Sequence, residues 1–228
     1  MSFTKETMQF LAENRIRDSR EWYNEHKELY KRAVVAPMVE LVKALTPDML
    51  KIDPQFIVDP RVDRTISRIY RDTRFSHDKS LYRDYCWLIF IRDRKNMSLP
   101  AYYFEVSPTG FGYGMGYYTT PVPVMNEMRQ MILMEEVPAV RALDAFRNQD
   151  IFHMEGDVYK RSKYKDQSEE RKEWLDKKNI SFNTHSKDVE LLFSDRLTEV
   201  LKEDYRKLIP IYNFFCLAES KSSSISLF

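Results

Sequence analysis

Apolar residues recur at helical spacing near the beginning of the chain. Within residues 1–48, Phe10 and Leu11 share one face of a first short helix, and a longer periodic series follows over residues 22–45. Pro37 interrupts that series, and a proline inside a helix removes a hydrogen bond and clashes with the preceding turn. We therefore expect helices in this segment, with Pro37 kinking or dividing the longer one.

Two polar pairs have the spacing of helix starts. Asp18 is followed three residues later by Glu21, which resembles a capping box. Asp59 precedes Pro60, an arrangement that can begin a helix with proline at its first position. Periodicity does not decide between a helix and a strand for residues 61–75, and both interpretations stay open.

The pattern changes to that of strands over residues 86–118, which predict an antiparallel meander. The continuous apolar run at 86–91 has the length of a strand covered on both faces. The aromatic run at 102–106 is strand-prone, and residues 107–110 carry proline and glycine at favoured turn positions.

Four of the five glycines in the chain alternate with aromatic residues or methionine, at Gly110, Gly112, Gly114 and Gly116. Side chains alternate between the two faces of a strand, so one face of this strand would be bare backbone. Repeated glycine in a strand indicates close approach by a ligand or by another backbone segment.

Helical spacing returns in the second half of the chain. We expect helices near residues 124–132, 138–146, 168–178 and 197–215, followed by a frayed serine-rich tail at 220–228. No internal repeat or linker is visible. The fold class predicted is α+β, a single domain over residues 1–219 with a central antiparallel sheet packed by N-terminal and C-terminal helices.

Composition is that of a globular protein, with 43 % hydrophobic and 31 % charged residues. The balance of 36 basic and 35 acidic residues gives no signal for nucleic acid. The first residues lack a signal-peptide pattern and no stretch has the length of a membrane span, so we expect a cytoplasmic protein without a membrane partner. Cys86 and Cys216 are expected to be free thiols.

No known metal or cofactor pattern is present, and we predict no metal and no cofactor. The four histidines and two cysteines lack ligand spacing, and the glycine-rich stretch lacks the spacing of dinucleotide-binding and phosphate-binding loops. The sequence does not indicate an oligomeric state.

Positive charge gathers in one short segment. From Arg61 to Arg83 there are seven cations and three carboxylates, a local excess of four. The cations are Arg61, Arg64, Arg68, Arg71, Arg74, Lys79 and Arg83, and the carboxylates are Asp63, Asp72 and Asp78. Because guanidinium groups bind both carboxylate and phosphate, the segment is either an anion site or a set of internal ion pairs.

The run from Arg68 to Ser76, continued by Asp78-Lys79 and Tyr82, resembles the DUF2461 family of conserved hypothetical proteins. Weaker similarity extends over most of the chain, to its aromatic strand, its glycine-rich stretch and its final helix. The sequence departs from the family at Leu81, where proline is usual, and at residues 115–118, where a histidine is usual. The resemblance implies a compact α+β domain and no known reaction, substrate or cofactor.

We therefore expect a small anionic ligand, bearing phosphate or carboxylate, to bind at the arginine-rich motif beside the glycine-rich strand. The candidate ligand-binding residues are Arg68, Arg71, Asp72, Arg74, Ser76, Asp78, Lys79, Tyr103, Gly112 and Gly114. One alternative is an enzyme acting on a phosphorylated or sugar-containing substrate, with Asp72 or Asp78 in a chemical role. The other is a structural or protein-interaction module whose arginines are internal ion-pair partners, for which Glu105 is a further candidate acid.

Overall fold

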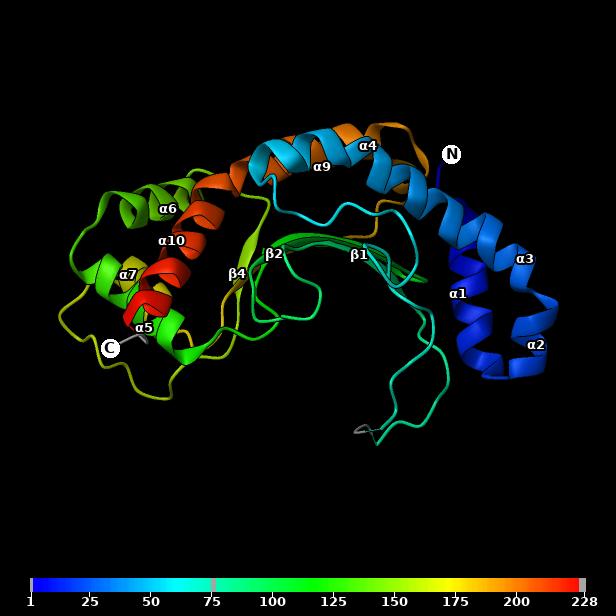
Figure 1. Ribbon diagram of the computed structural model, residues 1–228, viewed down its shortest axis with the longest axis horizontal. Coiled ribbons are helices and arrows are strands. Elements are labelled where there is room, and N and C mark those ends of the chain that lie inside the picture. The colour runs from blue at the N-terminus through cyan, green and yellow to red at the C-terminus, as the bar shows by residue number, and fades with distance from the viewer. Residues whose placement is uncertain (1, 75–76, 226–228) are drawn as a thin grey trace. The chain divides into compact units, whose positions relative to one another are not determined.

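The computed structural model describes residues 2–74 and 77–225, and the chain has an α+β fold (Figure 1). Its contacts divide it into two compact units. The first unit comprises Met1–Arg92, Tyr103–Tyr113 and His185–Lys202, and the second comprises Asp93–Tyr102, Gly114–Thr184 and Glu203–Phe228. The single domain over residues 1–219 stays a prediction.

Within the described residues, five strands form one antiparallel sheet. They are β1 (Cys86–Phe90), β2 (Ala101–Ser107), β3 (Gly110–Gly116), β4 (His153–Glu155) and β5 (Ser181–Ser186). The strand order is β1-β2-β3-β5-β4, and β4 pairs with β5 in antiparallel fashion. The predicted fold class and the meander over residues 86–118 are confirmed.

The sheet is larger than expected, because β4 and β5 lie outside residues 86–118. Residues 181–186 contain one phenylalanine among serine, asparagine, threonine and histidine, so they have no strong apolar alternation. Long-range pairing with β3 makes them a strand.

The first unit is built on helices that precede β1. They are α1 (Lys5–Arg17), α2 (Arg20–Glu25), α3 (Lys27–Tyr30), the π-helical turn η1 (Lys31–Val35) and α4 (Ala36–Ile52). The expected interruption near Pro37 is present as η1, which ends directly before α4. A proline has no N–H to donate, and the wider turn accommodates that loss. α8 (Val189–Phe193) also belongs to this unit.

The expected capping box at Asp18 and Glu21 is wrong, because the N-cap of α2 is Ser19 and Glu21 is then only the second residue of the helix. Ser19 is the N-cap of α2 and its hydroxyl accepts a hydrogen bond from the backbone N–H of Trp22, whereas Asp18 is the left-handed C-cap of α1. The Asp18 carboxylate instead accepts hydrogen bonds from the backbone N–H groups of Leu81 and Tyr82, at 2.7 and 3.2 Å. Asp18 therefore makes a long-range contact and not the local cap that was expected.

Residues 61–74 form neither of the structures considered from sequence. They are irregular, with isolated bridges between Tyr70 and Tyr82 and between Ile66 and Leu88. Their backbone hydrogen bonds nevertheless resemble those of an antiparallel pair, because the segment folds back on residues 81–89. The strand interpretation was closer than the helix interpretation, because the partners of these backbone hydrogen bonds lie on another segment of the chain, as they do in a sheet.

The second unit is an aromatic core surrounded by helices. These are α5 (Val122–Leu133), α6 (Val137–Arg147), α7 (Glu169–Leu175) and α10 (Ile209–Ile225), and α9 (Arg196–Lys207) contributes residues to both units. α10 packs against α5 and α6. The ring of Trp174 lies 5.3 Å from that of Phe182 and 6.2 Å from that of Phe214. α10 continues to Ile225, so the helix includes residues expected in the frayed tail.

Candidate functional site

The arginine-rich segment forms an irregular hairpin at the edge of the first unit. We call residues 61–74 and 77–83 the arginine hairpin. The backbone N–H of Arg71 donates to the carbonyl of Leu81, and that of Arg83 donates to the carbonyl of Ile69, both at 2.9 Å. Figure 1 shows this hairpin projecting away from β1. Ser76 lies outside the described residues.

Arginines of the hairpin have carboxylate partners nearby. Arg61 and Arg64 pair with Asp59, Arg68 pairs with Asp63 at 3.3 Å, Arg71 with Asp78 at 3.1 Å and Arg74 with Asp72 at 2.7 Å. Asp59 lies just before the segment in which charges were counted from sequence. The side chains of Arg68 and Arg74 are 63 % and 77 % exposed, so these pairs are at the surface and stabilise the fold little.

Asp72 and Asp78 are held in the ionised form. Hydrogen bonds from the Arg74 side chain lower the pKa of Asp72 to about 2. Hydrogen bonds from the hydroxyl and backbone N–H of Ser80 lower the pKa of Asp78, with further lowering by the charges of Arg15 and Arg71. A carboxyl with a lowered pKa is suited to fixing charge and poorly suited to donating a proton.

A hollow of about 280 Å³ lies elsewhere in the first unit. It is lined by the end of β2, the start of β3, the end of β5 and the residues that directly follow β2 and β5. Its lining includes Glu105, Ser107, Gly112, His185, Ser186 and Lys187. With Thr109, which also lines it, the hollow brings one carboxyl, one imidazole, one ammonium and three hydroxyl groups to a single place.

Glu105 is the unusual group in this hollow. It is half-buried, and in the part of the chain that the structure describes its carboxylate accepts no hydrogen bond. Burial raises the pKa of Glu105 and the nearby charge of Asp84 raises it further, whereas His185 and Arg83 lower it. A half-buried carboxyl with a raised pKa beside an imidazole can take up and release protons closer to neutral pH.

Two glycines of β3, Gly110 and Gly114, lie directly against the backbone of β5. A Cβ atom on Gly114 would lie 2.1 Å from the carbonyl oxygen of Phe182, and one on Gly110 would lie 2.2 Å from that of Ser186. These two glycines are needed because the backbone of β5 passes so close to them. Gly112 lines the hollow, and so does Gly110.

The expected site residues are therefore in several places. Arg68, Arg71, Asp72, Arg74, Asp78 and Lys79 lie in the arginine hairpin, and the Lys79 ammonium donates to the carbonyl of Thr73 at 2.9 Å. Gly112 lines the hollow, and neither Tyr103 nor Gly114 is among its lining residues.

Sequence reasoning missed His185 and Lys187, because β5 was not predicted. Glu105 had been considered only as a partner for arginine. Two sequence signals pointed to the hollow, the glycine-rich stretch containing Gly112 and an acidic residue within an aromatic strand.

The model of the family described as conserved hypothetical protein (DUF2461) matches residues 6–214. The chain belongs to the DUF2461 family. No curated protein matches this DUF2461 chain. Across residues 2–74 and 77–225, no three or more His, Cys, Asp or Glu residues group as metal ligands. No helix in the same range is both long and apolar enough to cross a membrane.

Proposed function

We propose that this DUF2461 protein binds a small anionic ligand, bearing carboxylate or phosphate, in the hollow beside the glycine-rich strand. The observation that carries the proposal is the Glu105 carboxyl, half-buried and without a hydrogen-bond donor in the described structure, facing the same hollow as His185 and Lys187. In this proposal the ligand supplies the partner that Glu105 lacks.

The charges around the hollow support an anionic ligand. Lys187 forms no ion pair within the described part of the chain, so its charge is available to a ligand. His185 adds a second cation when it is protonated. The hydroxyl of Ser186, which accepts a hydrogen bond from the backbone N–H of Asp188, can still donate its proton to a ligand. A protonated Glu105 would donate to the anion as well, which its raised pKa favours.

The arginine hairpin has a supporting role in this proposal. Five of its arginines, those at positions 61, 64, 68, 71 and 74, already have carboxylate partners. The Arg83 guanidinium instead donates to the carbonyl of Arg68 at 2.9 Å, and its charge acts on Glu105. An enzyme that uses Asp72 or Asp78 for proton transfer is less favoured, because both pKa values are lowered. The cytoplasmic location remains part of the proposal.

The proposal is tested by titrating phosphate, malonate and citrate while following the His185 imidazole resonances by NMR. We expect at least one of these anions to shift the resonances. Its affinity should rise as the pH falls, because Glu105, whose pKa is raised, gains a proton. Lys187→Gln should weaken binding about tenfold, the effect of removing one charge-assisted hydrogen bond.

Lys27→Gln is the matched control, since it removes an exposed lysine of the same unit that lies away from the hollow. Equal binding by wild type and Lys187→Gln would contradict the proposal. So would a His185 signal that none of the three anions moves.

A further inference from the structure

Three cationic side chains converge on one aromatic ring in the second unit. The guanidinium carbon of Arg129 lies 5.5 Å from the centre of the Tyr159 ring, and the ammonium nitrogens of Lys163 and Lys178 lie 5.2 and 5.4 Å from it. They come from α5, from the loop between β4 and α7, and from the segment after α7. We call these four residues the Tyr159 cluster.

None of the three cations forms an ion pair with a carboxylate within residues 2–74 and 77–225. Arg129 is only 5 % exposed, and it donates to the carbonyls of Leu175 and Lys177 at 3.0 and 2.6 Å. Neutral carbonyl groups satisfy its hydrogen bonds and leave its charge uncompensated. Lys163 and Lys178 are exposed.

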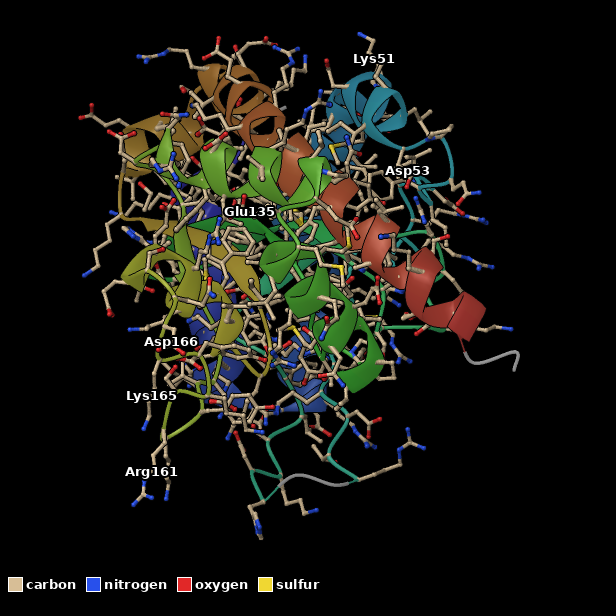
Figure 2. The ribbon with its side chains drawn as sticks, turned by 90° about the vertical axis from the view of Figure 1, so that its left-hand side faces the viewer. Lys51, Asp53, Glu135, Arg161, Lys165 and Asp166 are labelled. Carbon is tan, nitrogen blue, oxygen red and sulfur yellow. The ribbon has the colours of Figure 1, made fainter. Side chains whose placement is uncertain are left out.

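More cations surround the cluster. The loop from Asp157 to Asp166 has four basic residues and two acidic ones, an excess of two positive charges. Lys160, Arg161 and Lys165 are exposed and form no ion pair in the described part of the chain. Figure 2 shows the side chains of Arg161 and Lys165 extending outward from this loop. The local field therefore favours a ligand with several negative charges.

We propose that the Tyr159 cluster binds a compact ligand with adjacent phosphate groups. Lys163 and Lys178 would bind the phosphate oxygens as point charges at the surface. The buried guanidinium of Arg129 would add to the electrostatic attraction of the phosphates. The ligand is a free oligophosphate or the phosphate chain of a nucleotide, which share this chemistry. An extended nucleic acid is disfavoured, because basic and acidic residues balance over the whole chain at 36 and 35.

The test is calorimetric titration with tripolyphosphate, with a nucleoside triphosphate and with the corresponding nucleoside. We expect both phosphate compounds to bind, with an affinity that falls as salt is added, and the nucleoside not to bind. Tighter binding of the triphosphate than of tripolyphosphate identifies a nucleotide, and equal binding identifies a free oligophosphate. The double variant Lys163→Gln, Lys178→Gln should bind about tenfold more weakly or worse.

Lys95→Gln is the matched control, because Lys95 is another exposed lysine of the second unit. It should bind as wild type does, and Lys187→Gln should too, which separates this site from the hollow. Unchanged affinity in the double variant overturns the proposal, as does an equal loss in Lys95→Gln. The proposal is also overturned if a single-stranded oligonucleotide binds more tightly than tripolyphosphate and this binding depends on the two lysines.

Discussion

The arginine hairpin and the Tyr159 cluster both gather positive charge, but they compensate it in different ways. In the hairpin, each of Arg61, Arg64, Arg68, Arg71 and Arg74 has a carboxylate oxygen within 4.0 Å. In the cluster, Arg129, Lys163 and Lys178 share an aromatic ring and have no carboxylate partner among the residues described. The hairpin was the more conspicuous region in the sequence, and these five arginines have acidic partners.

This difference shows why counting charges along a chain does not locate an anion site. Arg74 pairs with Asp72 and Arg61 with Asp59, two residues away in each case, so these arginines have counterions in the adjacent sequence. The cations of the cluster are far apart in sequence, and only folding brings them together. A site for an external anion requires cations that the protein itself leaves uncompensated.

The largest effect is expected at Arg129. Arg129→Ala removes the donors for two buried carbonyls, those of Leu175 and Lys177, and should lower the free energy of unfolding by roughly 2–4 kcal/mol. Urea denaturation measures this loss. Arg129→Lys should lose less, because an ammonium can still serve one carbonyl. A loss as small as that of Arg74→Gln would show that the buried guanidinium is not a structural part of the cluster.

A smaller effect is expected at Asp78, which Arg15 and Arg71 contact at 3.0 and 3.1 Å. Its lowered pKa means that its ionised form stabilises the folded state above the ordinary pKa of aspartate. This stabilisation is lost as the pH falls through the lowered pKa of the folded state. Asp78→Asn should therefore melt at a lower temperature than wild type at neutral pH and at the same temperature in strong acid. A difference that persists in acid would assign the effect to packing.

The hairpin's influence on the hollow can be measured at Glu105. Arg83→Gln should raise the pKa of Glu105 further and Asp84→Asn should lower it, since these charges act on it in opposite directions. NMR titration of the Glu105 carboxyl carbon measures both shifts. If neither variant changes the pKa of Glu105, then the hairpin and the hollow are electrostatically independent.

The smallest effects are expected from single exposed cations. Arg74→Gln breaks a surface pair whose arginine is 77 % exposed, and it should lower the melting temperature only slightly. Lys163→Gln breaks no ion pair and should leave the melting temperature of the free protein nearly unchanged. Thermal melts at low and high salt compare the two. If the melting temperature fell more for Lys163→Gln than for Arg74→Gln, the contrast between the hairpin and the Tyr159 cluster would be wrong.

Much of the fold was predictable because its signals are local. The meander of β1, β2 and β3 follows from apolar and aromatic runs separated by turns, and the helices before and after it follow from periodicity. β4 and β5 were not predictable in this way. Both are mostly polar, β4 has only three residues, and β5 becomes a strand through its place beside β3.

The residues of the candidate sites also divide into those that local sequence indicated and those that only long-range pairing brought into place. The sequence pointed to Gly112, whereas His185 and Lys187 reach the hollow only because β5 is there. The glycine alternation was correctly interpreted as close approach, but it could not distinguish a ligand from a backbone. At Gly110 and Gly114 the approaching group is the backbone of β5.

By itself the sequence determined the α+β class, the family and the excess of arginine between residues 61 and 83, because each depends on neighbouring residues. Only the tertiary structure decided which cations have partners, which glycines face a backbone and where Glu105 is buried. The physical reason is that ion pairing, burial and backbone approach depend on distances between residues far apart in the chain. Composition and spacing do not contain those distances.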